Sequence, residues 1–300
     1  MITISCTVRN NLFPVISHAL RFSRDGRKVQ LMTHRPQTHS TASLLLFAAC
    51  VAVPARLAAG PPPQASVGFD SYINQVEARL TQQHRSAHAF LGQSVSDDAR
   101  LRHGDLIVEQ IPAAAAVPGA MIHHWRGAAF APGATAADFE RLLRDIDAYP
   151  RHFAPQVERA TVLGQRDGRS DGRIQATLRV RQRHAITVVL DTTYDIAFGR
   201  LDARHGWVAS RSTRIAEIDS PGTRSERSLS ATEEHGFLWR LNTYWSYEER
   251  DGGLYIEIES VSLTRSIPPG LAWAVRPFVE SVPRDSLEFT LRSARNALHK

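Results

Sequence analysis

The chain has 300 residues, and its 36 Lys and Arg outnumber its 30 Asp and Glu, so the formal net charge is +6. Residues 1–59 hold seven of these bases and one of the acids, which leaves 29 of each in the rest of the chain. Beyond that segment the charge is balanced, so there is no electrostatic case for a nucleic-acid partner. Cys6 and Cys50 also lie in residues 1–59, which excludes a disulfide, a thiolate metal site and a cysteine nucleophile from the remainder.

An apolar run near the N-terminus is typical of a secretory signal peptide. The run extends from Thr41 to Val53, a basic residue precedes it at Arg35, and small residues follow it up to Gly60. It is shorter than the stretch of about twenty apolar residues that a membrane span needs. We therefore expect residues 32–59 to be a signal peptide.

The predicted signal peptide determines where we expect the protein to be located. Met32 is expected to be the true start, with residues 1–31 as a mis-called extension, and the mature protein is expected to be exported, to the periplasm. Two alternatives stay open: an N-terminal anchor that is never cleaved, and a lipid attached to Cys50. Contact with a membrane is expected only through the leader or transiently.

Residues 60–117 precede the densest pattern in the chain. The proline-rich residues 60–67 predict an extended linker. Residues 68–117 are interpreted as an N-terminal extension, in which the apolar stripe from Phe69 to Leu80 indicates a helix.

From residue 121 onward, strand and helix patterns follow one another closely. A strand is predicted over 121–130 and a helix over 135–148, which Tyr149 and Pro150 end. Apolar residues then alternate with a period of two, which predicts further strands over 156–165, 174–180, 186–198 and 207–218.

The C-terminal part is predicted to be a hairpin followed by helical segments. Asp251-Gly252-Gly253 supplies the positive φ angles of a tight turn between strands over 237–247 and 254–265. The second strand changes phase after Ile258, which predicts a bulge near Ser260. Pro277 is expected to kink or divide the following helix, and Pro283 to open a second one.

The order of strand, helix, antiparallel strands and terminal helix resembles the START-like or SRPBCC superfamily, of polyketide cyclase and lipid-transfer type. The resemblance covers Val117 to Leu298 and is strongest in residues 139–150 and in the terminal hairpin and helix. It implies an α+β domain over 118–300, in which a curved antiparallel sheet grips a long C-terminal helix. It also implies a largely apolar cavity between sheet and helix, with no cofactor.

The expected partner is a small hydrophobic or lipid-like ligand in that cavity. Trp239 and Trp245 are predicted to set its size, with Trp273 as a lid, and Arg126 and Arg179 could pair with an anionic head group. The full set of predicted ligand-binding residues is Trp125, Arg126, Arg179, Tyr194, Trp239, Leu241, Trp245, Trp273 and Phe278. The alternative for the aromatic residues is that they only fill the core, and for the arginines that they lie on the solvated face.

No strong catalytic motif occurs in the sequence, and no metal site is predicted. The leading hypothesis is a carrier or sensor without enzymatic activity. A cyclase or aromatase would need an acid–base group in the pocket, for which His123, His124 and Glu259 are the candidates. Adjacent strand residues point to opposite faces, so only one of the two histidines can face the cavity. A third hypothesis is an envelope protein that acts by partner contact and has a filled interior.

Overall fold

The computed structural model describes residues 60–92, 95–113, 117–166, 172–183, 187–267 and 272–298, without the side chains of residues 95–96, 165–166 and 272–280. Every described residue belongs to one compact unit of the chain. The predicted signal peptide, Met32 and Cys50 therefore lie outside the described residues. None of the described helices is long and apolar enough to cross a bilayer.

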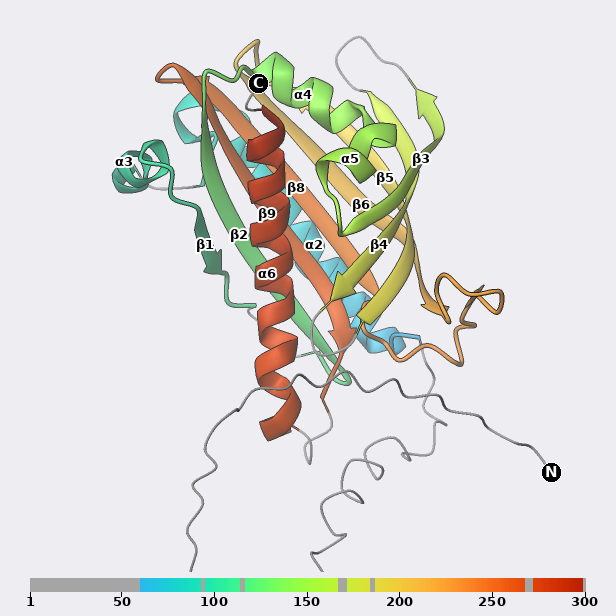
Figure 1. Ribbon diagram of the computed structural model, residues 1–300. Helices are drawn as coiled ribbons and strands as arrows, with labels where there is room; N and C mark the ends of the chain where they lie inside the picture. The colour runs from blue at the N-terminus through green and yellow to red at the C-terminus, as the bar shows by residue number, and fades with distance from the viewer. Residues whose placement is uncertain are drawn as a thin grey trace, which may run out of the picture. The chain divides into compact units, whose positions relative to one another are not determined.

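Helices stand at both ends of the described unit and between its first strands (Figure 1). The helices are α2 (Pro63–Gln83), α3 (Val95–Arg102), α4 (Ala136–Arg144), α5 (Tyr149–His152) and α6 (Ala272–Leu298), with short 3-10 turns η1 (Ala87–Ala89) and η2 (Ile146–Ala148). The strands are β1 (Ile107–Gln110), β2 (Ala120–Pro132), β3 (Val157–Arg166), β4 (Arg173–Arg183), β5 (Thr187–Arg200), β6 (His205–Asp219), β7 (Arg227–Ser228), β8 (Arg240–Arg250) and β9 (Gly253–Arg265).

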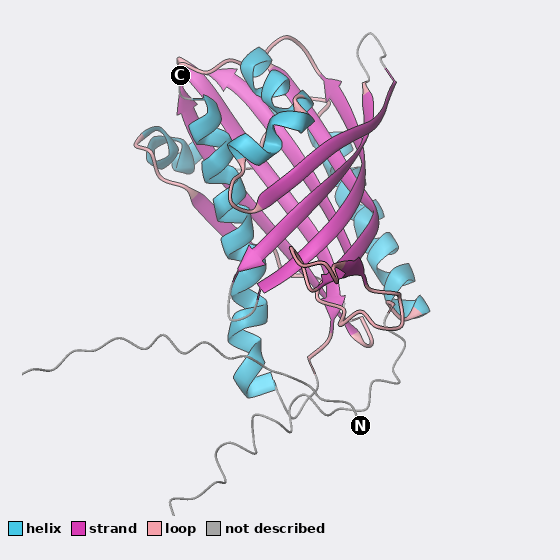
Figure 2. Ribbon diagram, turned by 45° about the vertical axis from the view of Figure 1, so that its right-hand side comes forward, coloured by secondary structure: helices cyan, strands magenta, loops and turns pink. Residues whose placement is uncertain are grey.

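One antiparallel sheet organises the unit. Its strand order is β1-β2-β9-β8-β6-β5-β4-β3, and β7 pairs with β6. The sheet twists and curls, and α6 lies across its inner face (Figures 1 and 2). The expected α+β fold, a large antiparallel sheet with a C-terminal helix and a helical N-terminal piece, is confirmed by this topology.

The predicted turn between the last two strands is also confirmed. β8 and β9 pair up to Arg250 and Gly253, so a loop of two residues joins them. Asp251 and Gly252 have φ angles of 57° and 75°. Positive φ at both central residues is the geometry that matches the twist of a two-residue hairpin.

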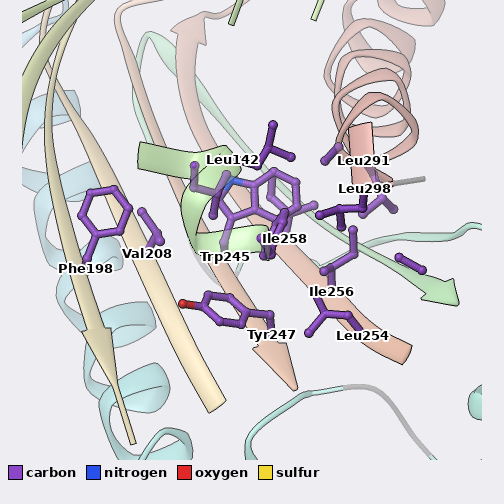
Figure 3. Close-up of a cluster of buried hydrophobic side chains, with 14 of the residues drawn as sticks. Leu142, Phe198, Val208, Trp245, Tyr247, Leu254, Ile256, Ile258, Leu291 and Leu298 are labelled. Carbon is purple, nitrogen blue, oxygen red and sulfur yellow. The ribbon is translucent and has the colours of Figure 1, made fainter. Parts of the chain in front are cut away.

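The inner face of the sheet carries the larger hydrophobic core. Trp245, Tyr247, Ile256 and Ile258 from the terminal hairpin lie in it with Leu291 from α6 (Figure 3). α4 adds a strongly amphipathic face that includes Phe139 and Leu143.

The outer face is covered by α2, which the sequence predicted as a helix without indicating what it contacts. Phe69, Ile73, Val76 and Leu80 of α2 pack in one cluster with Trp239, Tyr244, Val261 and Leu263. The proline-rich start is part of this helix, because α2 begins at Pro63 and proline fits the first helical turn. The extended linker predicted up to residue 67 is therefore wrong beyond Pro62.

Helices cover both faces of the sheet, and this explains why the apolar residues of β9 change phase. Its register is unbroken with β2 from Gly253 to Arg265 and with β8 from Gly253 to Leu263, so the bulge predicted near Ser260 is wrong. Ile258 faces the inner core, whereas Val261 and Leu263 face α2. An apolar residue on either face of this strand is buried, and the sequence pattern therefore loses its simple period of two.

The terminal helix is longer than the prolines suggested. α6 runs continuously from Ala272 to Leu298, so the separate second helix expected at Pro283 is not formed. Leu287, Leu291 and Ala294 are nearly inaccessible to solvent against the sheet, as the apolar stripe predicted. Packing along this stripe outweighs the missing backbone donor of a proline.

Candidate ligand site on the inner face of the sheet

The burial of residues on the inner surface of the sheet changes along the length of α6. Toward the C-terminal end of the helix, the facing residues Ala129, Ala131 and Ile256 are fully buried. Further toward its N-terminal end, the inward-facing apolar residues are only half-buried, although they belong to the same cluster. They include Trp125 of β2, Leu178 of β4, Leu241 of β8 and Phe289 of α6. Apolar surface is therefore incompletely covered in this part of the interface, as it also is at Val108 of β1 and Ala297 near the C-terminal end of α6.

Two polar side-chain atoms on the inner face of the sheet are buried without a hydrogen-bond partner in the described part of the chain. They are Nε1 of Trp125 and Oε1 of Gln182. Nε2 of Gln182 donates to Oγ of Ser286 at 2.7 Å, which ties the end of β4 to α6. Buried polar groups in proteins nearly always have a partner, so both atoms point to a bound molecule or water.

Gln182 contacts α6 directly, whereas Trp125 lies on β2 beside a residue that packs against the helix. Ser286, the partner of Gln182, is followed by Leu287, whose Cδ2 would lie 3.3 Å from a Cβ atom at Gly127. Gly127 is two residues from Trp125 on the same face of β2. This part of the inner surface thus combines apolar area with the amide of Gln182 beside α6 and the indole N–H of Trp125 on β2.

The predicted head-group arginines lie on the opposite face of the sheet, and the prediction that they enter the cavity is wrong. Nε of Arg126 donates to Oε1 of Glu109 at 2.8 Å. Arg179 donates to both carboxylate oxygens of Asp191, at 2.6 and 2.7 Å, and also to Glu226. Each arginine pairs with a carboxylate on its own face, which is the arrangement that solvated strand charges usually adopt.

The predicted aromatic lining is divided between the two faces. Tyr194, Leu241 and Trp245 lie on the inner face with Trp125. Trp239 lies on the outer face in the α2 cluster, so the prediction that it shares a face with Trp245 is wrong. The chain turns at Gly236, with φ at 78°, and β8 begins only at Arg240, so the alternation does not extend back to Trp239.

Two predicted residues cannot be compared in the same way. Trp273 and Phe278 lie within α6, and their side chains are outside the described residues.

Tyr194 is almost completely buried, and burial raises the pKa of its hydroxyl to about 12.

The two neighbouring histidines point to opposite faces, as their positions on a strand predicted. His123 faces inward, and its Nε2 lies 3.1 Å from Oγ1 of Thr264. His124 faces outward, where its Nε2 donates to Oε2 of Glu259 at 2.9 Å. Its Nδ1 then accepts from the hydroxyl of Tyr72 on α2, at 2.8 Å.

Glu259 belongs to a buried polar network between α2 and the sheet. Its Oε2 also accepts from Arg79 of α2 at 2.5 Å, and its side chain is 1% exposed. Burial raises the pKa of this carboxyl, but the hydrogen bonds from His124 and Arg79 together bring it below the usual value. The same face holds His84, whose Nε2 lies 2.8 Å from Oγ of Ser246.

Glu257 is the second buried carboxyl of this network. The backbone N–H of Gly92 donates to its two carboxylate oxygens at 3.0 and 3.1 Å. Burial raises the pKa of Glu257 to about 7, against the lowering effect of Arg126 and of the Gly92 N–H. Sequence analysis missed this network, because only the alternation of Glu257 and Glu259 with apolar residues hinted at a buried outer face.

We expect Glu257→Gln to change how stability depends on pH. The folded pKa, about 7, lies above the unfolded value of about 4.5, so the unfolded chain releases this proton first as the pH rises. Its contribution to folding is complete below about pH 4.5 and falls through about pH 7, by about 3 kcal/mol. The variant should therefore gain that much relative to the wild type between about pH 4 and pH 8, measured by urea unfolding.

Comparison of the two proteins at each pH removes the contribution of His84, whose pKa burial lowers to about 4 and which both proteins share. Glu288→Gln on the surface of α6, where Glu288 pairs with Arg292, is the matched control and should show no such trend. A constant difference between Glu257→Gln and the wild type across this range would contradict the buried position of Glu257.

Two hollows among the described residues lie away from α6. One, of about 280 Å³, is on the outer face of β3 to β6, beside Arg159, Arg179 and Arg214. The other, of about 20 Å³, lies beside Ala136 and Tyr247 and has room for one water molecule. Within the described residues, no group of three or more His, Cys, Asp or Glu side chains could hold a metal ion.

No family model matches the sequence, and no curated protein matches it either. Similar solved structures include a STAR-related lipid transfer protein from Xanthomonas axonopodis, with 17% identity, a TM-score of 0.39 and coverage of 64% of this chain and 99% of that chain. The Zhui aromatase/cyclase from a Streptomyces species has 14% identity and a TM-score of 0.40, with coverage of 59% and 93%. Human STARD10 has 12% identity and a TM-score of 0.38, with coverage of 67% and 80%.

These solved structures are of the two kinds, lipid-transfer proteins and aromatase/cyclases, that the sequence resembles. Since the identities and TM-scores are low, they show what the chain is similar to and carry no argument about its function.

Proposed function

We propose that the protein binds a small apolar or amphipathic molecule between the inner face of the sheet and α6. The observation that carries the proposal is the incomplete cover of the inner surface toward the N-terminal end of the helix. Half-buried apolar residues from β2, β4, β8 and α6 meet there, with the partnerless atoms of Trp125 and Gln182 among them. Binding sites for small molecules combine apolar lining with a few placed polar groups in this way.

The position of the acid–base pair favours a carrier over an enzyme of the cyclase type. A general base has to come within hydrogen-bond reach of the reacting group. The pair of His124 and Glu259 lies on the outer face under α2, on the far side of the sheet from the proposed ligand. His123 is the candidate that faces inward, and Thr264 is its hydrogen-bond partner.

Native mass spectrometry of the purified protein tests the proposed function. A carrier is expected to retain an apolar ligand, seen as a defined mass above that of the chain and released by organic solvent. A chain that carries no such mass and takes up no added amphiphile would overturn the proposal and favour a partner-binding protein with a filled interior.

We also propose that the protein is exported and loses its leader, as the apolar run and small residues before Gly60 predict. The intact mass of protein recovered from the periplasm is expected to correspond to a chain that begins near residue 60. A mass that corresponds to a start at Met1 or Met32 would show that the leader stays attached, and an added acyl mass would identify the lipidated form at Cys50.

A further inference from the structure

We infer that the hollow on the outer face of β3 to β6 binds a phosphate group, either of a soluble phosphate compound or of a lipid head. This site is separate from the ligand site proposed above, because it lies on the opposite face of the sheet. Three features of the hollow support the inference: the order of its side chains across the strands, its excess of positive charge, and a carboxylate of the chain that already contacts two of its arginines.

The hollow lies beside the part of the outer face that α2 covers. The cluster under α2 draws its sheet residues from β2, β6, β8 and β9 and from the segment before β8. The outer side chains of β3, β4 and β5 lie beyond this cluster, and Arg159, Thr161 and Arg214 are exposed to solvent. The volume of the hollow, about 280 Å³, far exceeds the ~10–15 Å³ that holds one water molecule. A phosphate group and part of the molecule that carries it therefore have room there.

The side chains around the hollow form two rows across the strands. In the first row, Arg159 of β3 lies opposite Arg179 of β4, which lies opposite Asp191 of β5. The second row is two residues away on each of these strands and consists of three threonines, followed by Arg214 of β6. The threonines are Thr161, Thr177 and Thr193. Residues two apart on a strand point to the same face, and neighbouring strands are about 5 Å apart, so the two rows border one small area.

The lining carries more positive than negative charge. It includes three arginines, and Asp191 is the one carboxylate among the described residues that line it. Arg179 is held by Asp191 through two hydrogen bonds, at 2.6 and 2.7 Å. Glu234, on which Arg214 acts electrostatically, lies outside this lining. The exposed side chains of Arg159 and Arg214 stand at opposite ends of the threonine row, so their guanidinium groups can approach an anion above the threonines from two sides.

The carboxylate of Glu226 shows that an anion can bind at the edge of the hollow. Glu226 lies between β6 and β7, accepts a hydrogen bond from Arg179, and has its Oε1 3.6 Å from Nη2 of Arg159. The backbone N–H of Gly222 donates to its Oε2 at 2.6 Å, which holds this loop beside the hollow. A ligand therefore has to compete with Glu226 for Arg159.

The directions of the donors favour a phosphate over a carboxylate. The threonine side chains rise from the sheet, and the guanidinium groups of Arg159 and Arg214 come from the two sides. A phosphate ester has three free oxygens that point in different directions and a charge of about −1.5 to −2 at pH 7. A carboxylate has two oxygens in one plane and a single charge. Hydroxyl and guanidinium donors around one point can therefore all be used by a phosphate.

Titration calorimetry of the purified full chain tests the site with inorganic phosphate, glycerol 3-phosphate and acetate, at low salt and at about pH 8, where phosphate is a dianion. We expect saturable binding of both phosphate compounds, at least about threefold tighter than that of acetate, and weaker binding as added salt screens the exposed arginines. Equal or tighter binding of acetate would overturn the inference.

Vesicles of phosphatidylcholine with and without phosphatidic acid distinguish the lipid source. Cosedimentation that requires phosphatidic acid and that glycerol 3-phosphate competes away would identify a lipid head group as the source, whereas binding of the soluble compounds alone would identify a soluble phosphate. A chain that binds neither the soluble phosphates nor these vesicles would overturn the inference.

Variants of the charged residues test the site in both assays. Arg159→Gln and Arg214→Gln each remove one exposed cation and are expected to weaken phosphate binding by about three- to tenfold. Glu226→Gln removes the competing carboxylate and is expected to strengthen it by at least about twofold. Arg141→Gln, on the surface of α4 where Arg141 pairs with Asp138, changes the net charge as the other arginine variants do and should bind like the wild type. If Arg159→Gln and Arg214→Gln bound phosphate as Arg141→Gln does, the inference would be overturned, and the function proposed for the inner face would be unaffected.

Discussion

Replacement of Trp245 by alanine is expected to lower the free energy of unfolding by about 3–5 kcal/mol. Trp245 is 6% exposed and lies among Leu142, Ile258 and the other residues of the inner core (Figure 3). Its ring meets that of Phe139 edge-on, with centroids 5.3 Å apart. Removing so large a buried side chain loses its transfer free energy and leaves a cavity that α4 and the sheet cannot close.

Urea unfolding followed by circular dichroism measures this change, with Trp125→Ala as the matched comparison. Trp125 is only half-buried at the proposed site, so its replacement should cost clearly less stability and should reduce ligand retention instead. The sequence alone suggested a different role for Trp245, as a residue that sets the size of a ligand cavity. A Trp245→Ala protein as stable as the wild type would support that earlier interpretation and contradict the packing described above.

Local patterns predicted the central architecture. The alternation in residues 237–247 and the turn at Asp251-Gly252-Gly253 identified β8 and β9, and the helical stripe ending at Leu298 identified α6. These features depend on residues that are close together in the sequence, so hydrophobic periodicity and turn-forming residues are enough to predict them.

The second cover on the sheet could not be predicted in the same way. The stripe from Phe69 to Leu80 indicates a helix with one buried side, but it does not say which surface the helix covers. The bulge predicted near Ser260 is wrong for the same reason, because the burial of Val261 depends on a helix almost two hundred positions earlier.

The site predictions failed where they depended on partners from other strands. The pairing of Arg179 with Asp191 follows from the register of β4 on β5, which places the two residues directly opposite each other. Gln182 was missed because its significance comes from Ser286 in α6, and a lone glutamine in a strand has no signal in sequence. Electrostatic partners and orphaned atoms are properties of the tertiary fold, and only residue type and face can be read beforehand.

We expect the second large loss of stability in the buried polar network between α2 and the sheet. Replacement of Arg79 by alanine should lower the free energy of unfolding by about 3–4 kcal/mol near neutral pH, because it leaves the buried carboxylate of Glu259 without its cation. The remaining hydrogen bond, from His124, is not charge-compensating while the imidazole is neutral. Protonation of Glu259 sets the upper limit to the loss, since the variant can take up a proton instead of burying the charge.

The dependence on pH identifies the cause. The wild-type pKa of Glu259 is lowered, so its contribution to stability is present above the unfolded pKa and is lost as the pH falls through the folded pKa. The difference between wild type and Arg79→Ala should therefore be largest near neutral pH and should shrink below about pH 4. Arg85→Ala, just beyond the end of α2 where Arg85 contacts Gln82, is the control and should change stability by less than about 0.5 kcal/mol.

A double variant separates the charge from the contacts of the arginine itself. In Arg79→Ala/Glu259→Gln the buried group is neutral, so most of the lost stability should return and the pH dependence should disappear. Unfolding curves of the four proteins form a double-mutant cycle, and a coupling energy near zero would show that Arg79 and Glu259 do not interact. If the cycle gives the expected coupling, α2 is held on the sheet by a buried ion pair as well as by its apolar stripe, and the helix is an integral cover of the outer face.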